Sequence, residues 1–287
     1  MISWRIVSAL SLILLNSACT NLQAVNTTSG QLVAAASSWN SVADEMEASC
    51  IRRNLVSDPA SDCSNEKVAT QHLEDANKIL SAYFTALQQV SNGSNFTVDA
   101  KLTNLSKSVA AIPKLNSAQV QAVSGLGSFL ANMATKAQEE RTIKNLILAV
   151  PQAEDMMDVM NDVVVKELIR VYKDEATNTL ATFNSYILQS GANIDLTKLD
   201  CKMGVSSKSF VNGTAYLLGQ AYCAKNTALF TKISALNNYS NSLTTAKAAL
   251  KSIESGKDDL TAQAIIQQLI AQATSLKTDI DAINKAF

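Results

Sequence analysis

The chain has 287 residues, with 24 basic and 25 acidic side chains, and its formal net charge at pH 7 is −1. The basic residues are dispersed along the sequence, which argues against nucleic acid as a partner, because phosphate binding needs a clustered basic surface. Three prolines, nine glycines and few aromatic residues favour helices over strands, and the length is sufficient to bury a sizeable core.

The first eighteen residues have the pattern of an export signal. Arg5 is followed by an apolar run from Ile6 to Leu15, and the segment ends in small residues, as secretory leaders do. A membrane-spanning helix needs about twenty apolar residues, and this run is about half as long. We therefore expect residues 1–18 to direct export and to be removed, not to anchor the chain by themselves.

The leader ends in the four residues Asn16, Ser17, Ala18 and Cys19. This box, together with the preceding apolar run, resembles the lipobox of a bacterial lipoprotein precursor, although Asn16 stands where Leu is usual. The resemblance covers residues 1–20 only, and no family is recognised for the rest of the chain. It implies cleavage before Cys19 and attachment of lipid to that residue. Ordinary cleavage after Ala18, without lipid, is the alternative.

Lipidation at Cys19 would make the membrane a partner of the protein. The resemblance implies a diacylglycerol on the sulfur and a fatty acid such as palmitate on the amine, and several acyl chains together give lasting attachment. It also implies a location in the bacterial cell envelope. Thr20 is not the Asp that retains lipoproteins in the inner membrane, so the outer membrane is favoured over the inner membrane, facing the periplasm or the cell surface.

Apolar residues recur in alternating steps of three and four along most of the remaining chain, which predicts helices. A short polar tether at 19–29 is expected to precede a first helix at about 30–50. The apolar stripe of the second helix runs from Ala69 to Val90, and the turn 92–95 stops it. A third helix is predicted between Thr97, a suitable N-cap, and Pro113.

The second half of the chain continues this pattern. A long helix is predicted from Ser117 to Val150, and Pro151 with the acidic residues that follow it favours a new helix that ends before Gly191. The stretch 191–209 is expected to be irregular. Two helices joined at Gly256 complete the chain, and their apolar stripes have the spacing of coiled-coil helices.

These patterns predict an all-α fold. We expect an elongated antiparallel helical bundle with long coiled-coil-like helices and a disulfide-stapled loop region. Neither an internal repeat nor a convincing domain boundary interrupts residues 30–287, so this stretch is read as a single helical-bundle domain.

Cysteine usage agrees with export. Cys19, if lipidated, leaves Cys50, Cys63, Cys201 and Cys223, an even set that fits an oxidising compartment. Three pairings are possible, and we favour Cys50 with Cys63 and Cys201 with Cys223 because each pair brackets a polar, loop-like stretch. A zinc site is the alternative, but neither pair has the short spacing typical of zinc ligands.

The sequence offers little catalytic chemistry. His72 is the only histidine, and its place beside the apolar stripe suits a structural role better than a ligand. An acidic group on one helix could bind a hard cation, although a solvated face is the simpler interpretation: Glu154, Asp155, Asp158 and Asp162. Three methionines could form an adaptable surface, although core packing is simpler: Met156, Met157 and Met160. We expect no enzyme, cofactor or metal.

The best candidate for a binding surface lies beside the second cysteine pair. Aromatic and aliphatic residues gather there: Phe210, Tyr216, Leu217, Leu218 and Tyr222. Tyrosine supplies large contact area at low entropic cost, which suits a protein interface. The alternative is that these rings fill the core where the bundle widens.

Together these observations predict a membrane-anchored, non-catalytic envelope lipoprotein that works through protein contacts, as an assembly factor, an adaptor or an immunity-type inhibitor of an unknown envelope protein. The alternative is a binder of a small or lipidic ligand between the helices. A helical membrane-active protein, suggested by the apolar stretch 142–150, and an enzyme are further alternatives with less support.

Overall fold

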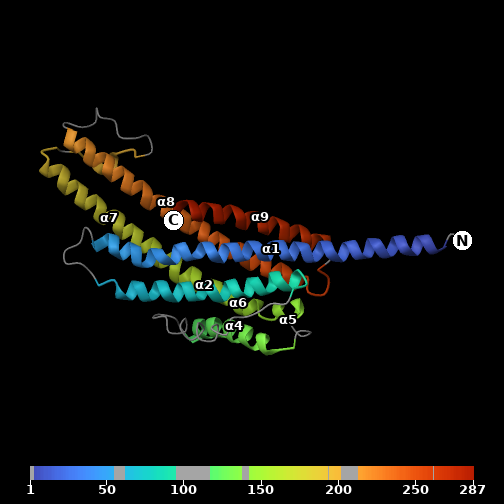
Figure 1. Cartoon of the computed structure of the whole chain (residues 1–287). Helices are drawn as coiled ribbons and strands as arrows, with labels where there is room; N and C mark the ends of the chain where they lie inside the picture. The colour runs from blue at the N-terminus through green and yellow to red at the C-terminus, as the bar shows by residue number, and fades with distance from the viewer. Residues whose placement is uncertain are drawn as a thin grey trace.

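Figure 1 shows the computed structural model, which describes residues 3–54, 62–94, 117–137, 142–192, 194–201, 213–260 and 262–287, with most side chains from residue 22 onward. All regular elements of these residues are helical, which confirms the all-α prediction. The elements are α1 (Ser3–Asn54), α2 (Ser64–Ser91), α4 (Ser117–Thr135), α5 (Ile143–Ile147), α6 (Val150–Met160), a π-helical turn (Asn161–Val165), α7 (Lys166–Gln189), a 3-10 turn (Leu196–Lys198), α8 (Gly213–Ser255) and α9 (Gln263–Ala286).

The helices form an elongated bundle. α1 packs against α2 on one side and α9 on the other, and α8 and α9 form a hairpin (Figure 1). α6 continues through the π turn into α7, which packs against α8, while α4 packs against α6. With 43 residues, α8 is about 64 Å long, so it links parts of the molecule that lie far apart.

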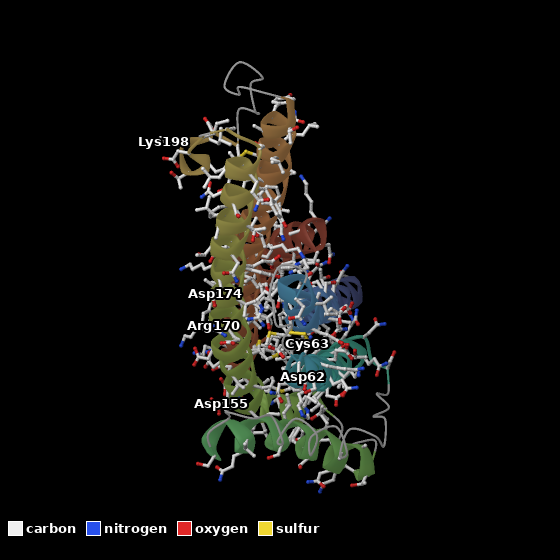
Figure 2. The ribbon with its side chains drawn as sticks, turned by 90° about the vertical axis from the view of Figure 1, so that its left-hand side faces the viewer. Asp62, Cys63, Asp155, Arg170, Asp174 and Lys198 are labelled. Carbon is white, nitrogen blue, oxygen red and sulfur yellow. A yellow bond between two sulfur atoms is a disulfide. The ribbon has the colours of Figure 1, made fainter. Side chains whose placement is uncertain are left out.

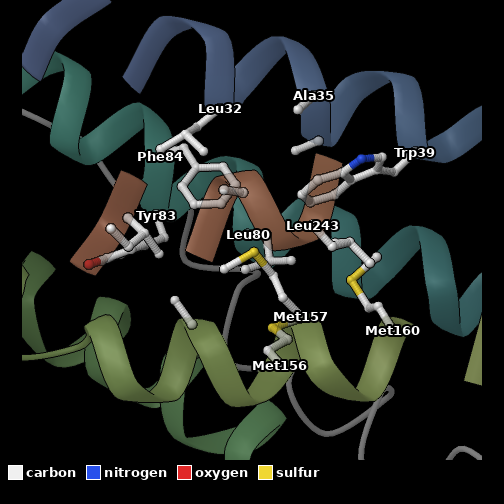
Figure 3. Packing of buried hydrophobic residues seen from close by; sticks show 14 of the residues in the cluster. Leu32, Ala35, Trp39, Leu80, Tyr83, Phe84, Met156, Met157, Met160 and Leu243 are labelled. Atoms are coloured by element: carbon white, nitrogen blue, oxygen red, sulfur yellow. The ribbon is translucent and has the colours of Figure 1, made fainter. Parts of the chain in front are cut away.

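Trp39 of α1 is buried in the main hydrophobic core, at 1% exposure (Figure 3). Its indole packs edge-on against Phe84 of α2 and Tyr239 of α8, at centroid distances of 6.5 and 5.9 Å. The indole N–H donates to Ser242 Oγ at 2.9 Å, so its one polar group is satisfied inside the core. Three elements that are distant in sequence thus meet on one side chain.

The structure differs from the sequence prediction at the start of the domain. Residues 22–29, expected in a polar tether, continue α1, and Val25, Thr28 and Ser29 are buried. The Thr28 hydroxyl donates to the carbonyl of Leu269 on α9 at 3.1 Å. The prediction failed because two buried positions of the stripe are hydroxyl residues, which a purely apolar pattern does not count.

The middle of the chain also differs. The long helix predicted from Ser117 to Val150 is divided: α4 ends at Thr135, and α5 is a separate short helix. Thr142 caps α5 by accepting a hydrogen bond from the Asn145 N–H, which marks a genuine helix start. The third helix predicted between Thr97 and Pro113 lies outside the described residues.

Other predicted boundaries are confirmed. Pro151 stands in the first turn of α6, where its missing N–H is tolerated. Gly191 follows the end of α7 with φ of 76°, in the left-handed region that favours glycine. Gly256 directly follows α8, before the turn that leads into α9.

Candidate functional site

The ends of α7 and α8 project together beyond the ends of α1 and α2 (Figure 1). We call this projection the arm and define it as residues 177–189 of α7, the turn residues 190–192 and 194–201, and residues 213–226 of α8. In Figure 2, Lys198 lies at the end of the arm, whereas Cys63 lies near the middle of the molecule. The N-terminal end of α1 lies at the opposite end of the bundle (Figure 1).

The arm contains a second hydrophobic cluster, separate from the main core. Its most buried members come from both helices and the turn: Ile187, Ala192, Leu196, Ala215, Tyr222 and Cys223. Phe183 of α7 packs edge-on against Tyr222 of α8, with the ring centroids 6.0 Å apart. The arm is therefore a small packed unit and not a pair of loose helix ends.

A disulfide closes the arm. Cys201, at the end of the turn, is bonded to Cys223 of α8, and Cys50 of α1 is bonded to Cys63 before α2. Both local pairings predicted from the sequence are confirmed. The first bond joins the end of α1 to the start of α2, and the second joins the turn of the arm to α8.

Large apolar side chains are exposed on the arm. Tyr186, Leu188 and Leu217 keep 49%, 65% and 64% of their surface exposed. Successive residues of a helix are rotated by about 100°. Tyr186 and Leu188 therefore flank the buried Ile187, and Leu217, two residues after the buried Ala215, faces away from the cluster. The arm thus exposes these three apolar side chains on more than one face of its helices, where each is accessible to a partner.

The structure divides the predicted binding patch. Tyr222 is buried at 6% exposure and Leu218 packs against the same cluster, so both belong to the interior of the arm. Leu217 is exposed, and Tyr216 is half-buried with its hydroxyl accepting a hydrogen bond from Gln220 at 2.6 Å. Phe210 lies outside the described residues.

Sequence reasoning missed Tyr186 and Leu188. Both lie on α7 next to the apolar stripe that carries Phe183 and Ile187. The sequence prediction considered only the residues of that stripe. Large apolar residues placed off a buried stripe are a usable signal, because nothing in the helix period requires them there.

An ionic cluster lies where the arm leaves the bundle. Arg52, in the last turn of α1, donates to Glu45 at 2.7 Å and to Glu175 of α7 at 3.3 Å. Glu45 also accepts hydrogen bonds from Lys232 of α8 and, at 2.7 Å, from the Tyr172 hydroxyl of α7. The cluster joins three helices through side chains that are mostly buried.

Two opposing effects set the pKa of Glu45. Burial alone would raise it, because the charged form loses hydration, but the hydrogen bonds from Arg52, Lys232 and Tyr172 outweigh burial and hold the pKa below its usual range. The same burial, with the neighbouring Glu45 carboxylate, raises the pKa of Tyr172. Glu45 is therefore a stable carboxylate and Tyr172 a stable hydroxyl donor at neutral pH.

Three of the four acidic residues predicted as a group on one helix form ion pairs, and the fourth, Asp155, is exposed. Lys247 and Lys251 of α8 reach Asp158 at 2.6 Å and Glu154 at 3.5 Å, and Lys166 pairs with Asp162 at 2.8 Å. Burial raises the pKa of Glu154, although Lys251 opposes the effect. Within the described ranges, no group of three or more His, Cys, Asp or Glu side chains is arranged to hold a metal ion.

The other singled-out residues are mostly structural. Met156, Met157 and Met160 are buried in the main core, at 0%, 0% and 2% exposure (Figure 3). His72 is half-buried on α2. Cys19 lies on α1, one helical turn before Gln23, and its side chain is not among those that the structure describes. In the part of the chain that the structure describes, no helix is both long and apolar enough to cross a membrane.

No protein-family model, curated protein or solved structure matches this chain.

Proposed function

We propose that this protein is a lipid-anchored bacterial envelope protein that acts through protein contacts made by its arm, without catalysis. Cys19 would carry the lipid, and the tip of the arm would contact a second envelope protein through Tyr186, Leu188 and Leu217. Such a protein would serve as an assembly factor, an adaptor or an immunity-type inhibitor.

The observation that carries this proposal is the separation of the two ends. The N-terminal half of α1, which carries Cys19, and the arm lie toward opposite ends of an elongated bundle (Figure 1), so a membrane attachment at Cys19 would leave the arm pointing away from the bilayer. Tyr186, Leu188 and Leu217 are exposed at the end that would be free, where a partner could reach them, although other exposed apolar side chains, such as Leu148 and Ile270, lie elsewhere on the molecule.

A crosslinking experiment in intact cells tests the contact. A photoreactive amino acid at Leu217 should give a discrete adduct, and the same amino acid at Leu148 provides a matched control, because Leu148 is 67% exposed but lies outside the arm, after α5. The adduct should be lost when Tyr186 and Leu188 are both changed to Ser. Equal adducts from both positions, or none from position 217, would contradict a contact through the arm.

Lipidation has a separate test. Cells fed a fatty-acid analogue should label the natural chain and leave the Cys19→Ala variant unlabelled. Fractionation of the envelope would then distinguish the outer from the inner membrane. A labelled Cys19→Ala variant, or an unlabelled natural chain, would contradict lipid attachment at Cys19. The contact through the arm would still be tested by the crosslinking experiment.

A groove favours a second candidate function, the binding of a single-chain lipidic ligand. The groove has a volume of about 590 Å³ between α1 and α9 and falls within the range of small-molecule sites. Ile266, Ile270 and Ala24 supply apolar surface, and Lys277 is the one charged residue among those that line it. An acyl chain with an anionic head group would suit this combination.

Fluorescence titration of the Cys19→Ser chain with a fluorescent long-chain fatty acid tests this candidate. Ile270→Asp should weaken binding, because it places a charge of the same sign as the ligand in the groove. Leu148→Asp is the control, since it adds the same charge at an exposed leucine outside the groove. Equal affinity of both variants and the parent chain would exclude this site.

A further inference from the structure

At the root of the arm, the buried residues between α7 and α8 change from apolar to polar. The main core reaches Tyr172 and the partly buried Ala176 on α7 and Leu229 on α8, and the cluster of the arm begins at the partly buried Leu180 and at Tyr222. Where the two clusters meet, the buried positions of α7 are Glu175 and Thr179, which are polar. We call this level the polar break.

Charged groups from three helices face the polar break. Glu175 is fully buried and is held by Arg52 of α1 at 3.3 Å, with Lys225 of α8 at 4.0 Å. Through Arg52 the set extends to Glu45, Lys232 and Tyr172. Glu175, Arg52 and Lys225 therefore lie at the break itself, whereas Glu45, Lys232 and Tyr172 extend the set into the adjoining end of the main core.

One buried polar group at the polar break also lacks a hydrogen-bond partner within the described ranges. Thr179 is 1% exposed, and its hydroxyl has no hydrogen-bond partner among the described residues. A buried hydroxyl without a partner weakens the folded state at that level. The contact between the two apolar clusters therefore depends on polar side chains, one of which is unpaired among the described residues.

Arg52 is held in place by its surroundings. It follows Cys50 by two residues in the last turn of α1, and the Cys50–Cys63 disulfide fixes that turn to the start of α2. Arg53 adds a second tie, an ion pair with Glu66 of α2 at 3.2 Å. The guanidinium thus reaches the arm from a firmly fixed part of the bundle.

We propose that the arm is a separate opening unit, bounded by the polar break and held closed there by the buried Glu175, which pairs with Arg52 of α1 at 3.3 Å and with Lys225 of α8 at 4.0 Å. Proteins open locally in units that follow their packing, and a small apolar cluster behind a polar level is such a unit. Opening would separate the arm portions of α7 and α8, within the limit set by the Cys201–Cys223 disulfide, and expose Phe183 and Tyr222. The main core would stay folded.

This inference does not depend on lipidation or on the identity of a partner. It concerns the accessible states of the arm in the isolated chain. If the proposed contact exists, opening would enlarge the apolar surface available to it, but the contact and the opening are measured by different experiments and can fail independently.

Hydrogen exchange of the mature chain with both disulfides intact tests the proposal. Amides at 180–189 and 217–223 should exchange faster than those at 236–250, although all three stretches lie beyond the first turn of a long helix. Glu175→Gln removes the buried charge and should accelerate exchange of the arm by about tenfold or more, leaving 236–250 unchanged.

The neighbouring Asp174 provides a matched control. Its carboxylate lies on the outer surface of α7, paired with Arg170 at 3.0 Å (Figure 2), so Asp174→Asn should leave exchange of the arm unchanged. If Glu175→Gln does not fold, Lys225→Gln supplies a milder change at the same level, with a smaller acceleration confined to the arm. Equal exchange of arm and bundle in the natural chain, or acceleration of both together in the variant, would overturn the proposal.

Discussion

Arg52 and Glu175 are 123 positions apart in sequence, yet the guanidinium of the first donates to the fully buried carboxylate of the second at 3.3 Å. This contact joins the end of α1 to α7 at the root of the arm. A charged pair in such a place is costly to break, because each partner would leave the other poorly compensated inside the protein.

Arg52→Met should therefore destabilise the fold. The substitution keeps much of the apolar stem but removes the charge, and we expect a loss of about 2–3 kcal/mol in the free energy of unfolding. This is less than for a completely buried pair, because the Arg52 side chain is 28% exposed. Urea unfolding followed by circular dichroism measures the change.

Arg170→Met serves as the control for that measurement. Arg170 pairs with Glu167 and Asp174 on the exposed side of α7, where ion pairs contribute about 0–1 kcal/mol. Equal losses for the two variants would show that burial does not distinguish the pairs.

The ionic cluster should make the free energy of unfolding depend on pH. The pKa of Glu45 is lowered in the folded chain from an ordinary value of 4.5. Its contribution to stability is therefore fully present above 4.5 and is lost as pH falls through the lower folded-state pKa. The difference in unfolding free energy between the natural chain and Glu45→Gln should be constant near neutral pH and shrink in strong acid. A difference that grows on acidification would mean that the pKa is raised.

The two disulfides should differ in what they stabilise. Each closes a short loop, with separations of 13 and 22 residues, and contributes about 3 kcal/mol on the chain-entropy model. Replacing Cys201 and Cys223 by Ser should loosen the arm and change thermal unfolding of the main core only slightly. Replacing Cys50 and Cys63 by Ser should lower the midpoint of the main transition. Thermal circular dichroism with exchange of the arm amides separates the two effects.

Side chains of the arm should divide into structural and contact residues. Tyr222→Ala removes a buried ring and should destabilise the arm by about 3 kcal/mol, so lost binding in that variant would not identify a contact. Leu217→Ser changes an exposed side chain and should alter stability by no more than about 0.5 kcal/mol. A stability loss from Leu217→Ser as large as that from Tyr222→Ala would contradict this division.

Local patterns explain most of what could be predicted. The stripe through Leu32 and Trp39, the helix start at Pro151 and the helix end at Gly191 follow from residues close together in the chain. Thr28 and Ser29 were missed because hydroxyl residues in a core depend on a partner, here the Leu269 carbonyl for Thr28, which comes from a helix 241 positions away.

The candidate site was predicted only in part. The cysteine pair and the neighbourhood of Tyr216 to Tyr222 drew attention to the correct end of α8. Which of these residues is buried depends on how α7 lies against α8, and this register is set by side chains of both helices together. Tyr186 and Leu188 were not predicted as site residues, because α7 carries no cysteine that would have drawn attention to it. Their place beside the arm portion of α8 depends on the same packing of the two helices.

The helical class and the ends of several helices follow from local sequence, because periodicity and helix-terminating residues act over neighbouring residues, and the same reasoning favoured one of the three cysteine pairings. The structure was needed to establish that pairing, and to show that Arg52 reaches Glu175, that Tyr222 is inside while Leu217 is outside, and that the arm lies opposite the N-terminal end of α1. These relations depend on how helices pack against one another, and packing is a property of pairs of distant surfaces that no single stretch of sequence contains.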